Sequence, residues 1–398
     1  MRTLIVSDLH LGSLSRSDVL RRPELRAPLL DALAGVDRLV LLGDVLELRH
    51  GPAREAMDAA RPVFEDLGRA LGADGELVLV AGNHDHRLID PWLIARGELE
   101  EPPPLGIEQL LEPDEASPAY ERIAGWAAPA RVRVAYPGLW VREDVYATHG
   151  HYLDSHLTVP TLERLTVGAM SRLLDKPPAR FASVNDYEAV GAPMFAWRDA
   201  VARDAHTGAA LNGIATVDAW RTLGGAGKAG RRAGSRRGSL RKRATRAIRR
   251  RAMVVAFPIA VAALNRAGIG PLKASISGGE LRRAGLIAMG EVAARLRLGD
   301  AHVVFGHTHR AGPLPGDHAD EWRGSGGARL VNCGSWSYSA IFLSRADGEN
   351  PYWPGAAVLV AEDGEPQLLQ LLRERAHEEI RPAGAEAVSD PAAGAPTL

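Results

Sequence analysis

Short hydrophobic runs that each end in a polar cluster recur along this chain, and they restrict its fold more than any other feature. The runs span three to five residues and are rich in leucine or β-branched residues, which is typical of buried strands. Helical patterns at 24–33 and 54–71 separate the first three runs, and this alternation predicts βαβ units and a layered α/β sheet. The predicted strands are 3–6, 38–42, 77–80, 145–147, 302–305 and 329–331.

Composition limits the kinds of protein that this chain can be. Its 398 residues, of which 46% are hydrophobic, are enough for one large core or two smaller ones. The single cysteine, Cys333, excludes an intramolecular disulfide and a thiolate zinc cluster, so the 13 histidines and the acids are the candidate metal ligands. The first residues lack the apolar length and the cleavage site of a secretory signal, so we expect a cytoplasmic protein.

Basic residues are concentrated in one segment. Residues 221–251 hold thirteen of the 48 lysines and arginines and no acid, which leaves 35 bases against 49 acids elsewhere. Such a block marks a surface for anionic partners, either phospholipid head groups or nucleic acid, or else a solvated arm. The apolar segment 252–264 that follows is too short for a membrane span, which takes about 20 residues. It is either buried or inserted shallowly at the inner face of the membrane, where the protein would then be peripheral.

The strand pattern is interrupted by one long stretch, so the chain divides into parts. Residues 1–154 and 298–375 carry the predicted strands and form the two halves of one core. Residues 155–297 are mostly helical, basic and partly apolar, and they resemble an inserted cap. Residues 376–398 are rich in alanine, proline and acids, which predicts a disordered tail.

Five clusters of potential ligands occur at the ends of predicted strands. Each alone is an ordinary local pattern, but together they put carboxylates, an amide and imidazoles where open α/β sheets bind ligands. Buried polar groups at this density require partners or metal, and carboxylates mixed with imidazoles suit Mn, Fe or Zn better than Ca or Mg. The i, i+2 spacing of Asp8 with His10, and of His307 with His309, lets each pair approach one region. The clusters are Asp8-Leu9-His10, Gly43-Asp44, Gly82-Asn83-His84-Asp85, His149-Gly150-His151 and Gly306-His307-Thr308-His309.

Taken in order, the clusters DLH, GD, GNHD, HGH and GHTH resemble the motif set of the calcineurin-like metallophosphoesterases. The resemblance covers roughly 1–90, 140–155 and 300–365 and does not extend to the helical insert. It implies a layered αββα sandwich with an inserted helical cap, and a hydrolase acting on phosphoric ester or anhydride bonds. It also implies two divalent metal ions as cofactors, with Mn, Fe and Zn as the candidates.

The family pattern assigns the metal ligands residue by residue. Asp44 would bridge both ions, because one carboxylate has two oxygens and can neutralise two cations at once. The first ion would be held by Asp8, His10, Asp44 and His309, and the second by Asp44, Asn83, His149 and His307.

The same resemblance suggests which residues act on the substrate. His84 is similar to the family's catalytic histidine, which donates a proton to the leaving oxygen or stabilises charge on the phosphoryl group. Asp85 would orient His84, and His151 and Arg87 are candidates for substrate contacts. A hydroxide that bridges the two metal ions would attack phosphorus in line. Cys333 would then be a small buried residue rather than a nucleophile.

Family membership does not name the substrate, which depends on what covers the metal ions. A cationic, partly apolar cap suits a phosphate-containing substrate with an apolar body, either lipid-linked or nucleotide-linked. The order of the motifs, with a helical insert before the last one, is similar to that of the bacterial UDP-2,3-diacylglucosamine hydrolases. Many members of that group have arginine at the position of His84, so the chain departs from them there.

Two readings from other classes compete with this one. In the first, the basic block tethers a nuclease or phosphodiesterase to nucleic acid, although aromatic residues for base stacking are absent between Trp220 and Phe257. In the second, the chain is a non-catalytic scaffold that keeps the fold. The complete ligand set argues against a scaffold, which would not need to keep both metal sites and His84.

Overall fold

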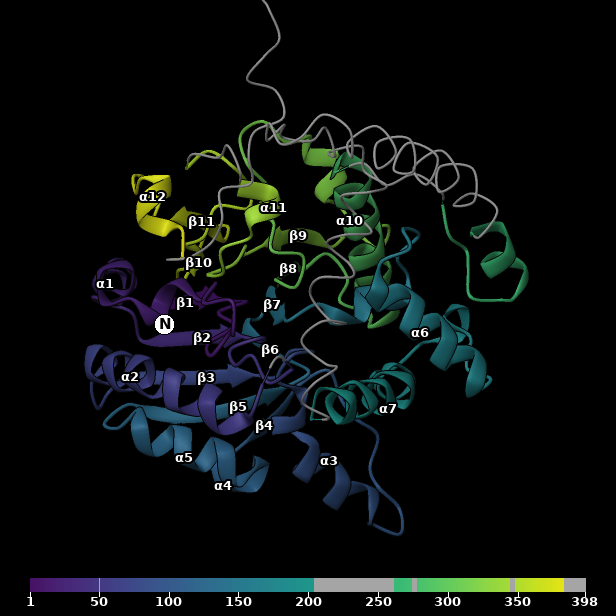
Figure 1. Ribbon diagram of the computed structural model, residues 1–398, viewed down its shortest axis with the longest axis horizontal. Helices are drawn as coiled ribbons and strands as arrows, with labels where there is room; N and C mark the ends of the chain where they lie inside the picture. Colours follow the sequence, from purple (N-terminus) through teal and green to yellow (C-terminus); the bar gives the residue numbers. More distant parts are fainter. Residues whose placement is uncertain (50, 204–260, 274–277, 344–347, 383–398) are drawn as a thin grey trace, which may run out of the picture.

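Two β-sheets are the centre of the fold, shown in Figure 1 as a computed structural model that describes residues 1–49, 51–203, 261–273, 278–343 and 348–382. The strands are β1 (Thr3–Val6), β2 (Arg38–Leu42), β3 (Glu76–Val80), β4 (Gln109–Leu111), β5 (Arg131–Tyr136), β6 (Gly138–Arg142), β7 (Val145–Thr148), β8 (His302–Phe305), β9 (Arg329–Asn332), β10 (Ala356–Val360) and β11 (Gln367–Gln370). The larger sheet has the order β11-β10-β1-β2-β3-β5-β4, and the smaller has the order β6-β7-β8-β9.

Helices and short 3-10 turns connect the strands. The α-helices are α1 (Pro23–Ala32), α2 (Ala53–Leu71), α3 (Asp90–Gly97), α4 (Pro113–Ala116), α5 (Pro118–Trp126), α6 (Leu162–Leu173), α7 (Val184–Arg203), α10 (Gly278–Arg295), α11 (Ala340–Leu343) and α12 (His377–Ile380). The 3-10 turns are η1 (Val19–Arg21), η2 (His86–Leu88), η3 (His151–Ser155), η4 (Pro178–Arg180) and η6 (Ala319–Trp322).

Each sheet buries both of its faces, which explains why its strands are almost wholly apolar. Ile5 and Val40 of the larger sheet pack with Val145 and Val304 of the smaller sheet in a core between the two sheets. Their neighbours in sequence point the other way, so that Leu4, for example, packs in a second core that contains residues of α1, α2 and α5. In Figure 1 these helices lie on one side, and α6, α7 and α10 lie on the other. The predicted layered αββα sandwich is therefore confirmed.

Strand direction places the motifs at one edge. β1, β2 and β3 are parallel to one another, and β7, β8 and β9 are parallel in the smaller sheet. Each motif follows one of these strands, so the carboxyl ends of both sheets supply the loops of the site. The two sets of loops also bond to each other, as when His307 N donates to Asp8 Oδ2 over 2.9 Å.

All six predicted strands form, and their bounds differ from the prediction by at most one residue. The strands that the prediction missed are β4, β5, β6, β10 and β11. Most lie toward the edges of the sheets, where tertiary pairing rather than a distinct local pattern selects the strand. The partition of the predicted strands into two sheets was also not part of the prediction.

The helical prediction for 155–297 agrees with the part of this segment that the structure describes. There α6, α7 and α10 pack with the outer face of the smaller sheet in one core, which includes Val167, Tyr187 and Met289. Residues 204–260, with the whole basic block and most of the apolar segment, lie outside the described residues. The separate cap therefore stays a prediction.

The first residues of the predicted disordered tail are folded. Residues 377–380 form α12, and Ile380 is fully buried against the first core. The Arg22 guanidinium donates to the carbonyl oxygens of Glu379 and Ile380. An apolar anchor and backbone hydrogen bonds thus hold a segment whose composition alone suggested disorder, and residues 383–398 lie outside the described part.

None of the helices in the described part of the chain combines the length and the apolar character needed to cross a bilayer.

Candidate metal centre

The structure brings all seven predicted metal ligands together in the loops that follow the strands. Potential ligand atoms gather in three overlapping groups, within each of which they lie less than 4.8 Å apart. Asp44 belongs to two of the groups and so lies between the other ligands. The groups are Asp8, His10 and His309; His10, Asp44 and His84; and Asp44, His149 and His307.

Five of these ligands adopt a left-handed backbone conformation, which side chains with a Cβ atom rarely take. The motifs lie beyond the ends of the strands. Because β1 ends at Val6, Asp8 and His10 lie in a tight loop rather than on one face of a strand. Such strain persists only where the surroundings impose it, and it clusters at functional sites. The φ angles are 56° for Asp8, 46° for His10, 51° for Asp44, 64° for His307 and 60° for His309.

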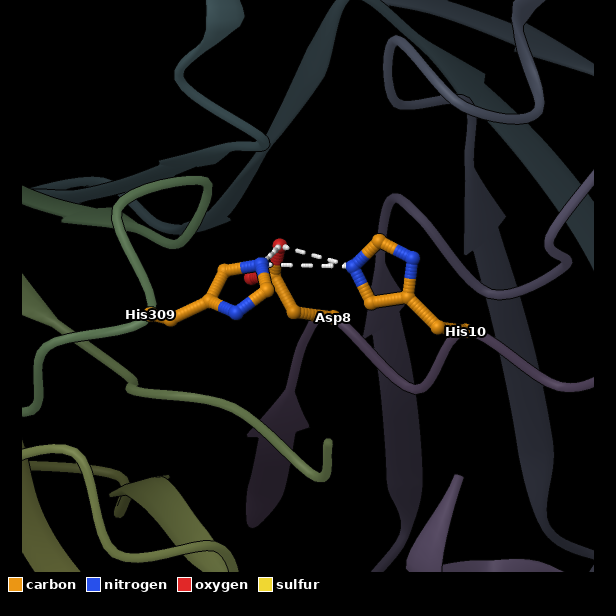
Figure 2. Close-up of side chains that lie close together, drawn as sticks. All are labelled: Asp8, His10 and His309. Atoms are coloured by element: carbon orange, nitrogen blue, oxygen red, sulfur yellow. Dashed lines mark hydrogen bonds and ion pairs between the residues drawn. The ribbon is translucent and has the colours of Figure 1, made fainter. Parts of the chain in front are cut away.

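The first group consists of electron-pair donors that face one another. His10 Nε2 lies 3.2 Å from His309 Nε2 and 3.9 Å from Asp8 Oδ1, and His309 Nε2 lies 3.2 Å from the same oxygen (Figure 2). Asp8 is fully buried, and its Oδ1 has no hydrogen-bond partner among the described residues. A buried carboxylate oxygen between two imidazole nitrogens matches the donor set of a transition-metal ion.

The third group, Asp44, His149 and His307, surrounds the amide of Asn83. One end of this amide lies 3.0 Å from His149 Nε2, 3.1 Å from His307 Nδ1 and 3.3 Å from Asp44 Oδ2. An inward oxygen would be a metal ligand, whereas an inward nitrogen would donate to the same three atoms in a protein without a cation. The other end of the amide lies 3.0 Å from Arg49 Nη1.

Acceptor groups behind the histidines fix which ring nitrogen faces the centre. His149 Nδ1 lies 2.9 Å from the Leu42 carbonyl oxygen, and a carbonyl only accepts, so Nε2 is the free nitrogen. His10 Nδ1 lies 3.1 Å from Glu47 Oε2, which leaves its Nε2 for the centre in the same way. His307 is reversed, because its Nε2 lies 3.0 Å from Asp154 Oδ2 and its Nδ1 faces inward. Metal-binding histidines have such outer partners, so these residues fit a metal centre.

Two glycines let the loops approach this closely. A Cβ atom on Gly82 would lie 2.2 Å from Asp44 Oδ1, and one on Gly306 would lie 2.4 Å from Asp8 Oδ2. Real Cβ atoms do not come so near a carboxylate, so glycine is required at both positions by close approach. The glycines of the GNHD and GHTH clusters therefore make room for the proposed ligands Asp44 and Asp8.

His84, the proposed catalytic histidine, lines the cavity next to these ligands. Its Nε2 lies 4.0 Å from Asp44 Oδ2, and its Nδ1 lies 2.9 Å from Glu47 Oε2. Because a carboxylate only accepts, Nδ1 carries the proton and Nε2 faces Asp44 as an acceptor. Burial lowers the pKa of His84 to about 4 against the opposing effect of Glu47 and Asp44, so the ring is neutral near pH 7.

Neighbouring charges stabilise the charged forms of Asp8, His10 and His149. Burial opposes this, yet the neighbouring His309 holds the pKa of Asp8 at about 2. Hydrogen bonding to Glu47 and the charge of Asp44 raise the pKa of His10 to about 9, against burial. Asp44 likewise raises the pKa of His149 to about 10. Protons on the imidazoles thus offset the buried carboxylates, which is the role that cations would take over.

The orienting role predicted for Asp85 needs correction. Asp85 Oδ2 accepts from the backbone nitrogens of Val45 and Leu46, and Oδ1 accepts from Gly82 N over 2.7 Å. This carboxylate therefore ties the GNHD loop to the GD loop, while Glu47 is the carboxylate bonded to the His84 ring. The only sequence signal for Glu47 was its place three residues after Asp44, and Asp154 had a similar place after the HGH cluster.

His151 and Arg87, the predicted substrate contacts, do not line the cavity beside the centre. His151 is buried, and neither of its ring nitrogens has a hydrogen-bond partner among the described residues. Arg87 is half-buried on η2. Both roles remain predictions that this geometry does not support.

A cavity of about 360 Å³ opens beside the centre. Asp44, Asn83, His84, His307 and His309 line it, so a ligand in the cavity would reach the proposed metal ligands directly. Apolar side chains from several elements complete its walls, among them Leu153, Leu157, Leu286, Phe305, Trp322 and Tyr352. The cavity thus combines a polar group of metal ligands with an apolar wall, as small-molecule sites commonly do.

Known proteins were compared with this chain by sequence and by structure. The comparison with curated proteins finds no match. A solved structure titled "Crystal Structure of Cold-Active Protein-Tyrosine Phosphatase of a Psychrophile Shewanella SP." aligns over 93% of this chain and 80% of its own, with 13% identity and a TM-score of 0.26. A TM-score this low does not establish a shared fold.

The sequence model of the family described as "Calcineurin-like phosphoesterase" matches residues 1–182, which contain the first four motifs. The match ends before the fifth motif, but the structure brings His307 and His309 of that motif into the same cluster as the others. Residues 1–182 are therefore similar to the calcineurin-like phosphoesterases, a family of hydrolases that act on phosphoric esters.

Proposed function

We propose that this protein is a phosphoesterase with two divalent metal ions that share Asp44. The observation that carries the proposal is the position of Asp44, whose Oδ1 lies 3.4 Å from His149 Nε2 and whose Oδ2 lies 3.8 Å from His10 Nε2. These two histidines belong to different predicted metal sites. One carboxylate with an oxygen toward each site supports a shared ligand between two ions.

The residues around the centre have distinct tasks in this proposal. Asp8, His10 and His309 hold the first ion, and Asn83, His149 and His307 hold the second. When bound, the ions would activate a water molecule and offset negative charge on the phosphoryl group. His84, positioned by Glu47, exchanges a proton with an oxygen of the substrate or stabilises charge on it.

The substrate class follows from the wall of the cavity. Apolar side chains such as Leu157, Leu286 and Trp322 would contact the part of the substrate beyond the phosphate. This supports a substrate with a phosphate head and an apolar or aromatic body, which is a lipid-linked or nucleotide-linked phosphate ester or pyrophosphate. Membrane attachment through 221–264 stays a prediction, because most of that segment lies outside the described residues.

An activity panel tests the proposal. The metal-free protein is supplied in turn with Mn²⁺, Fe²⁺ and Zn²⁺ and assayed on a monoester, a diester, a nucleotide pyrophosphate, a diacylated nucleotide pyrophosphate and DNA. We expect hydrolysis that a chelator abolishes reversibly and that Asp44→Ala and His84→Ala greatly reduce. Full activity in either variant would contradict the assigned roles. Preference for DNA would instead favour the nuclease reading, and equal rates with and without the acyl chains would refute the lipid-linked substrate.

A further inference from the structure

A buried carboxylate outside the centre contacts two of the loops that carry its motifs. Glu188, on α7, is 7% exposed, and its Oε1 accepts from the Tyr136 hydroxyl over 2.5 Å and from the Tyr152 hydroxyl. Its Oε2 lies 3.3 Å from His86 Nε2. His86 is in η2, directly after the GNHD cluster, and Tyr152 is in η3, directly after the HGH cluster. Glu188 therefore joins α7 to both loops.

These loops carry the ligands predicted for the second ion. Asn83 lies three residues before His86, and His149 lies three residues before Tyr152. Asp154, which bonds His307 Nε2, lies on η3 two residues after Tyr152. Three of the four ligands of the second site are thus connected to Glu188 through neighbouring residues, Asn83 through His86, and His149 and His307 through η3.

Other side chains on α7 strengthen the same connection. The Tyr187 ring stacks on the Tyr152 ring with 4.5 Å between centroids, and its hydroxyl lies 2.7 Å from His156 Nε2. Phe195, about two turns along α7, lies 4.8 Å from the His86 ring and 5.5 Å from the His151 ring, measured between centroids. One face of α7 therefore packs against both loops, so it can fix their positions.

The first site is held by different residues. Glu47 bonds the His10 ring, and Ser7 Oγ donates to Asp8 Oδ2 over 2.7 Å. The backbone nitrogen of His307 also donates to this oxygen, but the His307 side chain faces the second site. A change at Glu188 should consequently move the second site and leave the first site in place. This asymmetry separates a positioning role from a general effect on stability.

We propose that Glu188 is a positioning residue that holds the ligands of the second metal ion through His86 and Tyr152. The inference rests on the proposed two-metal function and adds that α7, which lies in the predicted insert, completes one of the two sites. Outer partners of metal ligands contribute roughly 10- to 100-fold in metal affinity. Glu188 bonds residues near the ligands rather than the ligands themselves, so the lower end of this range, about 10-fold, is expected here for the second ion alone.

The test measures Mn²⁺ binding to the metal-free full-length protein by isothermal titration calorimetry. His309→Ala and His307→Ala each remove a ligand of one site and so assign the two binding steps. Glu188→Gln keeps the size of the side chain and an acceptor for the tyrosines, but it cannot accept from His86 through its amide nitrogen. We expect about 10-fold weaker binding of the second ion and unchanged binding of the first.

Glu76→Gln is the matched control. Glu76 is a buried carboxylate that pairs with Arg38 over 2.5 Å and with Arg131 over 3.4 Å, at the start of β3 and away from the motif loops. The control should lose stability without changing either binding step. Tyr152→Phe removes one hydroxyl only, and it should also weaken binding of the second ion. This variant tests the proposal if Glu188→Gln does not fold.

Several outcomes would overturn the inference. Equal loss of both binding steps in Glu188→Gln would show a general structural role, and wild-type affinity for both ions in Glu188→Gln or Tyr152→Phe would show no positioning role. Wild-type protein that binds a single ion would refute the two-metal centre itself. This failure can be told from failure of the Glu188 proposal, because it is seen without any variant.

Discussion

Glu47→Gln is the perturbation that most directly tests how the centre is organised. The Glu47 carboxylate is buried and lies 3.1 Å from His10 Nδ1 and 2.9 Å from His84 Nδ1, and it also accepts from Arg49 N over 3.0 Å. A glutamine has one acceptor oxygen in place of two and turns an amide nitrogen toward one of these groups. With the amide nitrogen at the position of Oε2, His10 loses its acceptor and must move its proton to Nε2 or rotate away, whereas with the nitrogen at the position of Oε1 the Arg49 N–H loses its acceptor instead.

The size of the effect follows from these contacts. A hydrogen bond to a charged group contributes about 1.5–3 kcal/mol. About 1.4 kcal/mol corresponds to a tenfold change in an equilibrium constant. The loss of one such bond at His10 should therefore reduce the binding affinity for the first ion by roughly 10- to 150-fold. If His84 loses the bond instead, turnover should fall by about 10²- to 10⁴-fold, the usual contribution of a general acid or base.

Calorimetry with Mn²⁺ and steady-state rates on the best substrate of the panel measure both effects, with Glu76→Gln as the control for a buried glutamate outside the centre. A pH–rate profile adds a readout of His84, because loss of the Glu47 charge should change the ionisation that the profile reports. First-ion affinity, turnover and pH profile all equal to those of the wild type would refute the reasoning that Glu47 positions the two histidines.

Three further predictions use other features of the site. Asp44→Ala removes the ligand between the two groups, so we expect both ions to bind more weakly and turnover to fall more than about 100-fold; retention of two tight binding steps would contradict the shared ligand. Gly82→Ala puts a Cβ 2.2 Å from Asp44 Oδ1, so it should destabilise the fold by about 1–3 kcal/mol in urea unfolding and weaken metal binding, and a neutral result would mean that the loop relaxes freely. Burial opposes a charge on His86, but Asp90 and Glu188 raise the pKa of this histidine to about 9. The stability that protonated His86 contributes is therefore complete below its unfolded pKa of about 6.5 and is lost as pH rises through 9. Between pH 7 and 9.5 the unfolding free energy of His86→Gln should therefore fall less steeply than that of the wild type, by up to about 1.4 kcal/mol per pH unit, and parallel curves would contradict this.

The sequence by itself determined the strands that carry the motifs and the composition of the centre. A run such as Thr3–Val6 is apolar at every position and is followed at once by polar residues, so its burial and its end are both local properties. The ligands Asp8, Asp44 and His149 could be assigned because each stands directly after such a run in a recognisable motif. Parallel strands then bring their carboxyl ends to one edge in any fold of this class.

Only the tertiary structure decided which residues support the ligands. Asp154 bonds His307 across 153 positions of the chain, and Glu188 contacts His86 across 102. Glu47 replaced Asp85 as the partner of the His84 ring, because the backbone amides of a neighbouring loop occupy Asp85. Local periodicity records whether a side chain is buried in a strand or helix, but a hydrogen bond between distant residues depends on where the packed layers place them. For that reason the cluster of proposed ligands could be predicted from the sequence, and the residues bonded behind them could not.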